Sequence, residues 1–213
     1  MAVDMTPPET APAFLAAHGW EGAEIVPLAG DASFRRYFRI LTPGRSAILM
    51  DAPPPHEDPR PFLAIAHWLL DRGFSAPAIL GEDPERGFVL LQDFGDARMR
   101  ETVDAAPESE LRLYEAAVDV LIRLHREEAA PVRPYDLAEY QREAGLFTQW
   151  YCPASGLGVD EAAYRAAWDE VLGTVLEARP VTVLRDYHAE NIMLTGADGN
   201  DPNGGLGLLD FQD

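Results

Sequence analysis

The chain has 213 residues, and its 17 basic and 36 acidic side chains give a formal net charge of −19. All 17 basic residues are Arg and none is Lys, which excludes a Walker A phosphate-binding loop and Schiff-base lysine chemistry. The acidic excess repels nucleic acid phosphates and anionic membrane surfaces, and no basic run offsets it, so we expect neither partner.

The beginning of the sequence carries no recognisable targeting signal. The segment Met1-Ala-Val-Asp-Met5 lacks the basic patch and the apolar core of a signal peptide. The longest apolar stretches fall well short of the roughly 20 residues needed to cross a bilayer. The single cysteine, Cys152, cannot form an internal disulfide. The sequence therefore predicts a cytoplasmic protein.

The first half of the chain is predicted to form a small, mainly antiparallel sheet with one packed helix. Runs of β-type residues are separated by turn-forming residues, as in hairpins, and residues 29–33 are the first such turn. A Pro near the start and apolar residues at helical spacing predict the packed helix. The expected strands are residues 24–28, 34–41, 46–51 and 88–93, and the expected helices are 13–18 and 61–71.

The second half is predicted to be mostly helical and to end in a hairpin. Helices are expected at residues 108–126, 135–151 and 160–178, and a β-type run follows at 181–184. Short apolar strands at 192–194 and 206–209 flank a polar loop. In the first of these helices the apolar face is predicted from a 3.6-residue spacing: Leu111, Tyr114, Val118, Leu121, Ile122 and His125.

Three oxygen-bearing side chains near the end of the chain carry the chemical information. Asp186 and Asn191 are five positions apart, and Asp210 follows the predicted hairpin. In phosphoryl transfer, an Asp near the attacking hydroxyl accepts or orients its proton, and an Asn and a second Asp hold Mg²⁺. The hairpin returns the chain and brings Asp210 beside the loop that holds Asp186. This spacing predicts a phosphotransferase with Asp186 catalytic and Asn191 and Asp210 binding metal.

The same region resembles a known family. The run Arg185-Asp-Tyr-His-Ala-Glu-Asn-Ile-Met-Leu194 is similar to the catalytic loop of aminoglycoside phosphotransferase-like kinases. Four further segments narrow the resemblance to the bacterial anomeric kinases of N-acetylmuramate and N-acetylglucosamine used in cell-wall recycling. They are Gly30-Asp-Ala-Ser-Phe-Arg-Arg-Tyr-Phe-Arg39, Leu49-Met-Asp-Ala-Pro-Pro54, Glu143-Ala-Gly-Leu-Phe-Thr-Gln-Trp-Tyr151 and Asp210-Phe-Gln-Asp213.

The resemblance implies an α+β, two-lobed, protein-kinase-like fold with an N-lobe at residues 1–93 and a C-lobe at 94–213. It implies ATP and Mg²⁺ as cosubstrate and metal, and a small-molecule hydroxyl acceptor, the C1 hydroxyl of an amino sugar. Gly30 and Ser33 are expected to meet phosphates, although a plain tight turn is a comparable interpretation. The remaining expected contacts are a hinge at Gln92, Asp93 and Phe94 that meets adenine, and supporting roles for Arg185, His188 and Asp213.

Three positions depart from the general kinase pattern. The strand-three Lys is missing, because Ala47-Ile-Leu-Met50 occupies that strand. Arg35, Arg36 and Arg39 lie nearby, and alternation with Phe34 and Phe38 favours Arg36 as the replacement; alternatively, these Arg residues line an exposed strand. Leu184 replaces a His that supports the catalytic loop, and Gln212 replaces the Gly of the D-F-G element.

Other functions are compatible with parts of this pattern. Aminoglycoside, choline and other hydroxyl-acceptor kinases share the chemistry, and a net charge of −19 suits a cationic acceptor. A nucleotide-binding pseudokinase without catalysis is the alternative from another class, suggested by the missing Lys. Because Asp210 lies three residues from the end of the chain, we also expect a fragment that lacks part of the C-lobe.

Overall fold

The computed structural model describes residues 5–28, 34–196 and 204–211. The predicted site residues Gly30, Ser33 and Asp213 lie outside the described residues. The chain divides into two compact units, Met1–Arg123 together with Leu184–Asp213, and Leu124–Val183. This division does not fall at residue 93, and the expected lobe boundary there stays a prediction.

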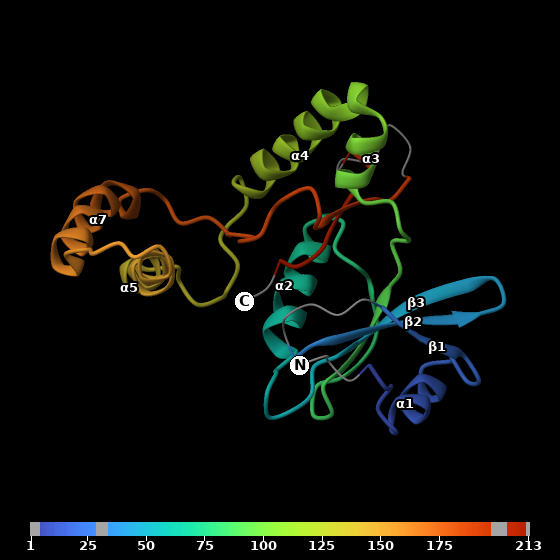
Figure 1. Ribbon diagram of the computed structural model, residues 1–213. Coiled ribbons are helices and arrows are strands. Elements are labelled where there is room, and N and C mark those ends of the chain that lie inside the picture. The colour runs from blue at the N-terminus through green and yellow to red at the C-terminus, as the bar shows by residue number, and fades with distance from the viewer. Residues whose placement is uncertain (1–4, 29–33, 197–203, 212–213) are drawn as a thin grey trace. The chain divides into compact units, whose positions relative to one another are not determined.

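The first unit contains a five-stranded antiparallel sheet (Figure 1). The predicted strands are confirmed to within two residues at each end, and one strand that the sequence pattern missed lies at an edge of the sheet. In sheet order the strands are β1 (Glu24–Pro27), β2 (Arg36–Thr42), β3 (Arg45–Asp51), β5 (Phe88–Gln92) and β4 (Ile79–Asp83).

The missed strand, β4, has a weak sequence signal. It contains Gly81 and two acidic residues, which are depleted in strands. Its pairing with β5 is irregular between Ile79 and Gly81, as is common at sheet edges. A Cβ on Gly81 would lie 2.3 Å from the ring of His18, so this position has no room for a side chain.

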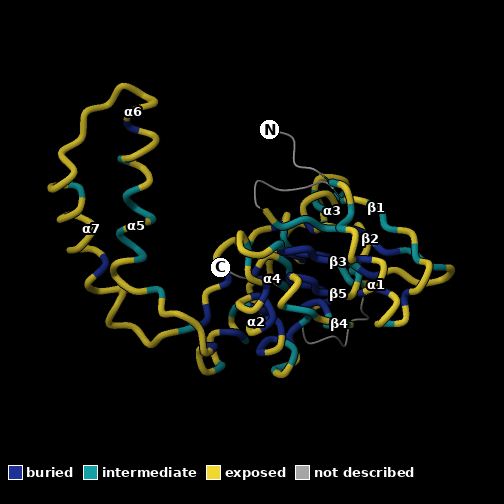
Figure 2. The backbone as a smooth tube through the Cα atoms, turned by 90° about the horizontal axis from the view of Figure 1, so that it is seen from below, coloured by how far each residue is buried: buried dark blue, intermediate teal, exposed yellow. Residues whose placement is uncertain are grey.

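One face of the sheet is covered by α1 (Ala11–Ala17). Phe14 and Leu15 of this helix pack with Phe38 and Ile40 of β2 and Leu90 of β5, and all five side chains are buried. In Figure 2 the residues of the middle strands of the sheet are mostly coloured as buried. Because strand side chains alternate between faces, the burial of Phe38 and Ile40 here directs the intervening residues of β2 to the opposite face.

The first unit also contains the helices α2, α3 and α4 and a two-stranded hairpin. The helix α2 (Arg60–Asp71) lies between β3 and β4 in sequence, and its Phe62 ring stacks on Phe211 with centroids 5.3 Å apart. A hairpin of β6 (Ile192–Leu194) and β7 (Leu206–Leu208) is present as predicted. The other helices are α3 (Met99–Ala105), which the sequence pattern missed, and α4 (Glu110–Leu124), preceded by a 3₁₀ turn at Pro107–Ser109.

The predicted apolar face of α4 is wrong. Leu111, Tyr114, Val118 and Ile122 are exposed, as is His125 just beyond the helix. The buried face is formed by Leu113, Ala117 and Val120. The helix has apolar residues on more than one side, so the 3.6-residue spacing was satisfied by two different stripes.

The second unit is helical. Its elements are α5 (Leu137–Leu146), a π-helical turn (Phe147–Tyr151), α6 (Cys152–Ala154) and α7 (Glu161–Leu176). The side chains of Asp136 and Asp160 cap α5 and α7 by accepting backbone N–H bonds at 3.0 Å. The predicted strand-like run at 181–184 is not a strand; Thr182 is buried and its hydroxyl oxygen accepts the N–H of Ala130 at 2.9 Å. Of the helices in the described ranges, none has the length and apolarity that a bilayer crossing requires.

Candidate active site

The predicted catalytic loop is a compact, hydrogen-bonded turn between Leu184 and β6. The carbonyl of Asp186 accepts the N–H of His188 at 3.0 Å and the side-chain amide of Asn191 at 3.1 Å. His188 is exposed, and its ring Nδ1 accepts the N–H of Glu190 at 3.3 Å. Asp186 is exposed, so the loop fixes its backbone and leaves its carboxylate accessible.

The loop is also fastened to neighbouring elements. Tyr187 donates its hydroxyl proton to the carbonyl of Ala117 on α4 at 2.8 Å. Burial raises the pKa of Tyr187 to about 12, because the charged phenolate is disfavoured away from water. Arg100 on α3 donates its backbone N–H to Ala189 at 3.1 Å. These bonds hold the loop against two helices of the same unit.

Asn191 and Asp210 come together across the hairpin, as predicted. The side-chain amide nitrogen of Asn191 donates to Asp210 Oδ2 at 3.4 Å, and the N–H of Leu209 donates to the Asn191 carbonyl at 2.9 Å. An amide oxygen and a carboxylate are the ligands that Mg²⁺ prefers, so this pair fits a magnesium site. Among the described ranges, the structure groups no three His, Cys, Asp or Glu side chains in a metal-binding cluster.

Backbone strain marks the same two segments. Arg185 and Asp210 have φ values of 52° and 51°, the left-handed region that residues other than Gly rarely adopt. Such conformations cost about 1–3 kcal/mol each and concentrate at functional sites, where the surrounding structure holds them. Arg185 directly precedes the predicted catalytic residue Asp186, and Asp210 is itself a predicted metal ligand.

A cleft of about 820 Å³ joins these residues to the sheet. This volume suits a ligand of nucleotide size, since small-molecule sites commonly measure about 300–1,000 Å³. All its residues belong to the first unit. The lining includes Asp186, Asn191 and Asp210 from the C-terminal segment and Arg35, Tyr37, Arg39, Ile48, Gln92, Asp93 and Phe94 from the sheet region.

The predicted hinge residues Gln92, Asp93 and Phe94 all line the cleft. Gln92 exchanges two bonds with Ala78: its backbone N–H donates to the Ala78 carbonyl at 2.9 Å, and its side-chain oxygen accepts the Ala78 N–H at 3.3 Å. The ring of Phe94 packs so closely on Gly207 that a Cβ there would lie 2.7 Å from it. The segment after β5 is thus anchored both to the sheet and to the hairpin.

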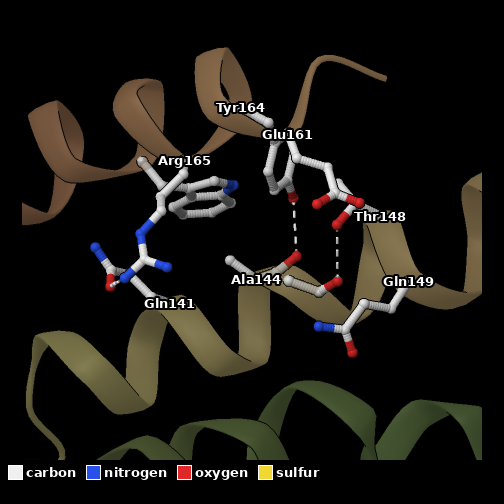
Figure 3. Close-up of a pocket in the computed structure, with 9 residues that line it drawn as sticks. Gln141, Ala144, Thr148, Gln149, Glu161, Tyr164 and Arg165 are labelled. Atoms are coloured by element: carbon white, nitrogen blue, oxygen red, sulfur yellow. Dashed lines mark hydrogen bonds between the residues drawn. The ribbon is translucent and has the colours of Figure 1, made fainter. Parts of the chain in front are cut away.

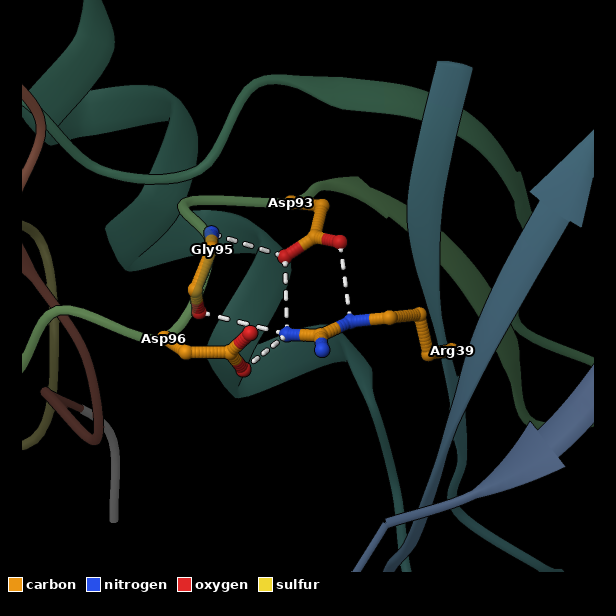
Figure 4. A network of polar contacts seen from close by, with 4 residues as sticks. All are labelled: Arg39, Asp93, Gly95 and Asp96. Carbon is orange, nitrogen blue, oxygen red and sulfur yellow. Dashed lines mark hydrogen bonds and ion pairs between the residues drawn. The ribbon is translucent and has the colours of Figure 1, made fainter. Parts of the chain in front are cut away.

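An ion-pair network fixes this hinge segment to β2 (Figure 4). Arg39 lies 3.0 Å from an Asp93 oxygen and 2.7 Å from an Asp96 oxygen, and it donates to the Gly95 carbonyl at 3.2 Å. The Arg39 hydrogen bond is the largest cause that lowers the pKa of Asp96, and the same bond raises the pKa of Arg39. Arg39 therefore spans from the sheet to the hinge.

The expectation that Arg36 points into the cleft is wrong. Its Nε and Nη2 both donate to Asp51 Oδ2, at 2.8 and 2.6 Å, and its Nη1 donates to the Thr6 carbonyl at 3.1 Å. Arg36 shares the face of Phe38, but that face packs under α1 and does not line the cleft. Alternation was the correct rule; the cleft was assigned to the wrong side of the strand.

Sequence reasoning therefore missed several cleft residues. Tyr37 and Ile48 line the cleft from β2 and β3, and Glu57 lines it from the segment before α2. Arg35 also lines it. The sequence signal was partial: alternation separates the apolar pair Phe38 and Ile40 from the odd-numbered residues of β2. The packing of α1 on that pair shows that the odd-numbered residues are left for the cleft.

A second, smaller hollow of about 160 Å³ lies between α5 and α7 in the second unit (Figure 3). Tyr164 reaches across it and donates its hydroxyl to the Ala144 carbonyl at 3.0 Å. Arg165, Gln141 and Asp169 form a further polar chain between the two helices. No predicted site residue lines this hollow, and its contacts serve to join the helices.

Comparisons with known proteins find a matching family and related sequences. The sequence profile described as "Phosphotransferase enzyme family" matches residues 24–213. The chain is 42% identical over 211 residues to the N-acetylmuramate/N-acetylglucosamine kinase of Pseudomonas aeruginosa, covering 95% of this chain and 60% of that protein. The kinase of the same name from Pseudomonas putida is 40% identical over 191 residues, covering 87% of this chain and 53% of that protein. The chain thus spans a little over half the length of these relatives.

Solved structures share the fold at low sequence identity. The ternary complex of streptomycin, ATP and APH(2")-IIa has a TM-score of 0.59 and 13% identity, covering 97% of this chain and 74% of that one. A choline/ethanolamine kinase family protein from Mesorhizobium loti has a TM-score of 0.56 and 18% identity, covering 95% of this chain and 62% of that one. The predicted α+β, kinase-like fold class is confirmed.

Proposed function

The chain belongs to the phosphotransferase enzyme family, and we propose that it is an ATP-dependent kinase of the anomeric hydroxyl of an amino sugar, N-acetylmuramate or N-acetylglucosamine. The observation that carries this proposal is the meeting of Asp186, Asn191 and Asp210 at one cleft. The two Pseudomonas relatives, named for these two sugars, support the choice of acceptor.

In this proposal Asp186 acts on the acceptor. Its carboxylate accepts the proton of the sugar hydroxyl as the hydroxyl oxygen forms its bond to the γ-phosphorus. The bond between that phosphorus and the bridging oxygen breaks, and the electron pair leaves with ADP. The loop contacts of Asn191 and His188 keep the Asp186 backbone in place during this step, because general bases act only at hydrogen-bond distance.

Asn191 and Asp210 are the residues that would hold Mg²⁺. The bound ion supplies charge stabilisation for the phosphate oxygens during transfer. Gln92, Asp93 and Phe94, which line the same cleft, would receive the adenine end of ATP at the hinge. Arg185 and His188 would support the loop, while Gly30, Ser33 and Asp213 remain predictions outside the described residues.

The test is acceptor-dependent ADP release by the protein with Mg-ATP and a panel of N-acetylmuramate, N-acetylglucosamine, choline and aminoglycosides. We expect turnover with an amino sugar and a loss of about 10²–10⁴ in kcat for Asp186→Asn. The matched control is Asp71→Asn, which removes the same charge at an exposed position on α2 outside the cleft lining. Turnover with choline or an aminoglycoside alone would reassign the acceptor, and ATP binding without any turnover would make the protein a pseudokinase.

A further inference from the structure

The source of positive charge for the nucleotide phosphates is open, because β3 has no Lys at the usual place. Ile48 lines the cleft from β3, and Met50 shares its face by alternation. Both side chains are apolar, so the cation comes from another element. We propose that Arg35, oriented by Glu57, is the residue that binds the α/β-phosphates of the nucleotide; this inference rests on the proposed kinase function.

The register of the sheet identifies which arginines face the cleft. Tyr37 on β2 pairs with Met50 on β3, and Arg39 pairs with Ile48. Residues two apart share a face, so Tyr37 and Arg39 of β2 face the same side, and Arg35, the residue directly before β2, continues this row along the cleft lining. All three line the cleft, whereas Arg36 is held by Asp51 on the core face.

Arg98 also lines the cleft, from the segment before α3, whereas Arg35 and Arg39 lie at opposite ends of this row. Four residues of extended chain span about 13 Å, a separation that places Arg35 and Arg39 near different parts of one bound nucleotide. Arg39 contacts Asp93, Gly95 and Asp96 at the hinge, so its end belongs to the adenine. Arg35 is at the other end, where the phosphates would lie.

Arg35 forms an ion pair with Glu57, a residue of the connection between β3 and α2. Its Nε donates to Glu57 Oε2 at 3.2 Å, and the two side chains are only 13% and 18% exposed. Glu57 lies in the connection between β3 and α2, the helix that follows strand three. In protein kinases a cation of the sheet pairs with a Glu of this helix, and the pair must be in place for phosphate binding. Here the proposed cation is not on β3 but on the residue directly before β2.

Tyr37 lines the same cleft as Arg35 and the proposed metal ligand Asp210. Burial is the largest cause that raises the pKa of Tyr37, and a hydrogen bond with Arg35 opposes that rise. The charges of Asp210 and Glu57 also act on the Tyr37 hydroxyl. Arg35 and Asp210 both line the cleft beside Tyr37. A planar guanidinium can bind two phosphate oxygens at once while Glu57 fixes its orientation.

The experiment measures the affinities of ATP and adenosine by calorimetry in the presence of Mg²⁺. We expect Arg35→Gln to weaken ATP binding about 10- to 100-fold, because charge-assisted hydrogen bonds are lost. Adenosine has no phosphates, so its affinity stays within about twofold. Arg35→Lys recovers part of the ATP affinity, since Lys keeps the charge but lacks the paired donors.

Glu57 is tested as a positioning residue through a double-mutant cycle. Glu57→Gln weakens ATP binding by a smaller factor than Arg35→Gln, and in the Arg35→Gln background it adds less than it does alone. The matched control is Arg86→Gln, which removes an arginine that pairs with Asp83 outside the cleft lining. We expect the ATP affinity of the Arg86→Gln variant to equal that of the wild type.

The outcomes separate the two proposals. Unchanged ATP affinity in Arg35→Gln, or an equal loss of ATP and adenosine affinity, overturns the assignment of Arg35 and leaves the kinase function standing. A selective loss of ATP affinity in a protein that phosphorylates no acceptor supports Arg35 and refutes the kinase function. Failure of the wild-type protein to bind ATP refutes both.

Discussion

Replacing Arg36 by Met tests whether this residue is structural. The Asp51 side chain is 3% exposed and receives two bonds from Arg36, at 2.8 and 2.6 Å on one oxygen. Removing one partner of a buried pair costs about 3–5 kcal/mol, because the other charge is left buried and unpaired. Arg36 itself is 18% exposed, so we expect the lower end, about 3 kcal/mol. For a chain of this length that corresponds to a fall of about 6–12 °C in Tm.

The loss of stability in Arg36→Met also depends on pH. Burial raises the pKa of Asp51 above its usual value of 3.8, and the hydrogen bond and charge of Arg36 oppose this rise. A raised pKa means that the folded protein binds more protons than the unfolded chain, so stability falls as pH rises above about 4. Without Arg36 the pKa rises further. The difference in stability between variant and wild type is therefore large at pH 7 and shrinks as pH falls toward 4.

The assay is urea unfolding of both proteins at pH 4.5 and pH 7, with equal m-values as the check on two-state behaviour. In the double variant Arg36→Met/Asp51→Leu no buried charge remains, and we expect stability within about 1 kcal/mol of wild type. A destabilisation below about 1 kcal/mol at pH 7, or one that does not change with pH, would refute the reasoning. The buried pair would then be worth no more than a surface ion pair.

Two further predictions concern α4 and the catalytic loop. Leu113→Ala should destabilise the protein by about 2–5 kcal/mol, because Leu113 is 1% exposed. Leu111→Ala should change stability by less than about 0.5 kcal/mol, because Leu111 is 71% exposed. Similar losses of stability in the two variants, measured by urea unfolding, would contradict the observed buried face of the helix. The phenol of Tyr187 should ionise near pH 12 in the folded wild type. In a spectrophotometric titration its signal is identified as the one that is missing from the Tyr187→Phe variant. Because the unfolded chain releases that proton near pH 10, rising pH between these values favours unfolding; ionisation near 10 in the folded protein would show that the Tyr187 hydroxyl is accessible to water.

The meeting of the three proposed catalytic and metal-binding residues was predictable from the sequence. Asp186 and Asn191 lie within one short loop, so their spacing alone determines that they can meet. Two short apolar runs around a polar loop predicted the hairpin that returns Asp210, and the structure brings its carboxylate to 3.4 Å from the Asn191 amide. The hinge residues at the end of β5 likewise line the cleft as expected.

The buried faces of β2 and α4 could not be predicted from the sequence in the same way. On β2 the period of two correctly separates Arg36 from Arg35 and Arg39, but only the packing of α1 on Phe38 and Ile40 shows which row meets the core. On α4 two apolar stripes fit the helical period, and tertiary contacts bury the one with Leu113. The edge strand β4 has a weak pattern of its own, and its pairing with β5 makes it a strand.

The sequence by itself determined the kinds of elements, their order and the loop that carries Asp186, since these depend on neighbouring residues in the chain. The tertiary structure alone decided which side of each element is buried and which arginine faces the cleft. Periodicity distinguishes the sides of a helix or strand but is the same whichever side faces inward, so that decision requires the partner element to be in place.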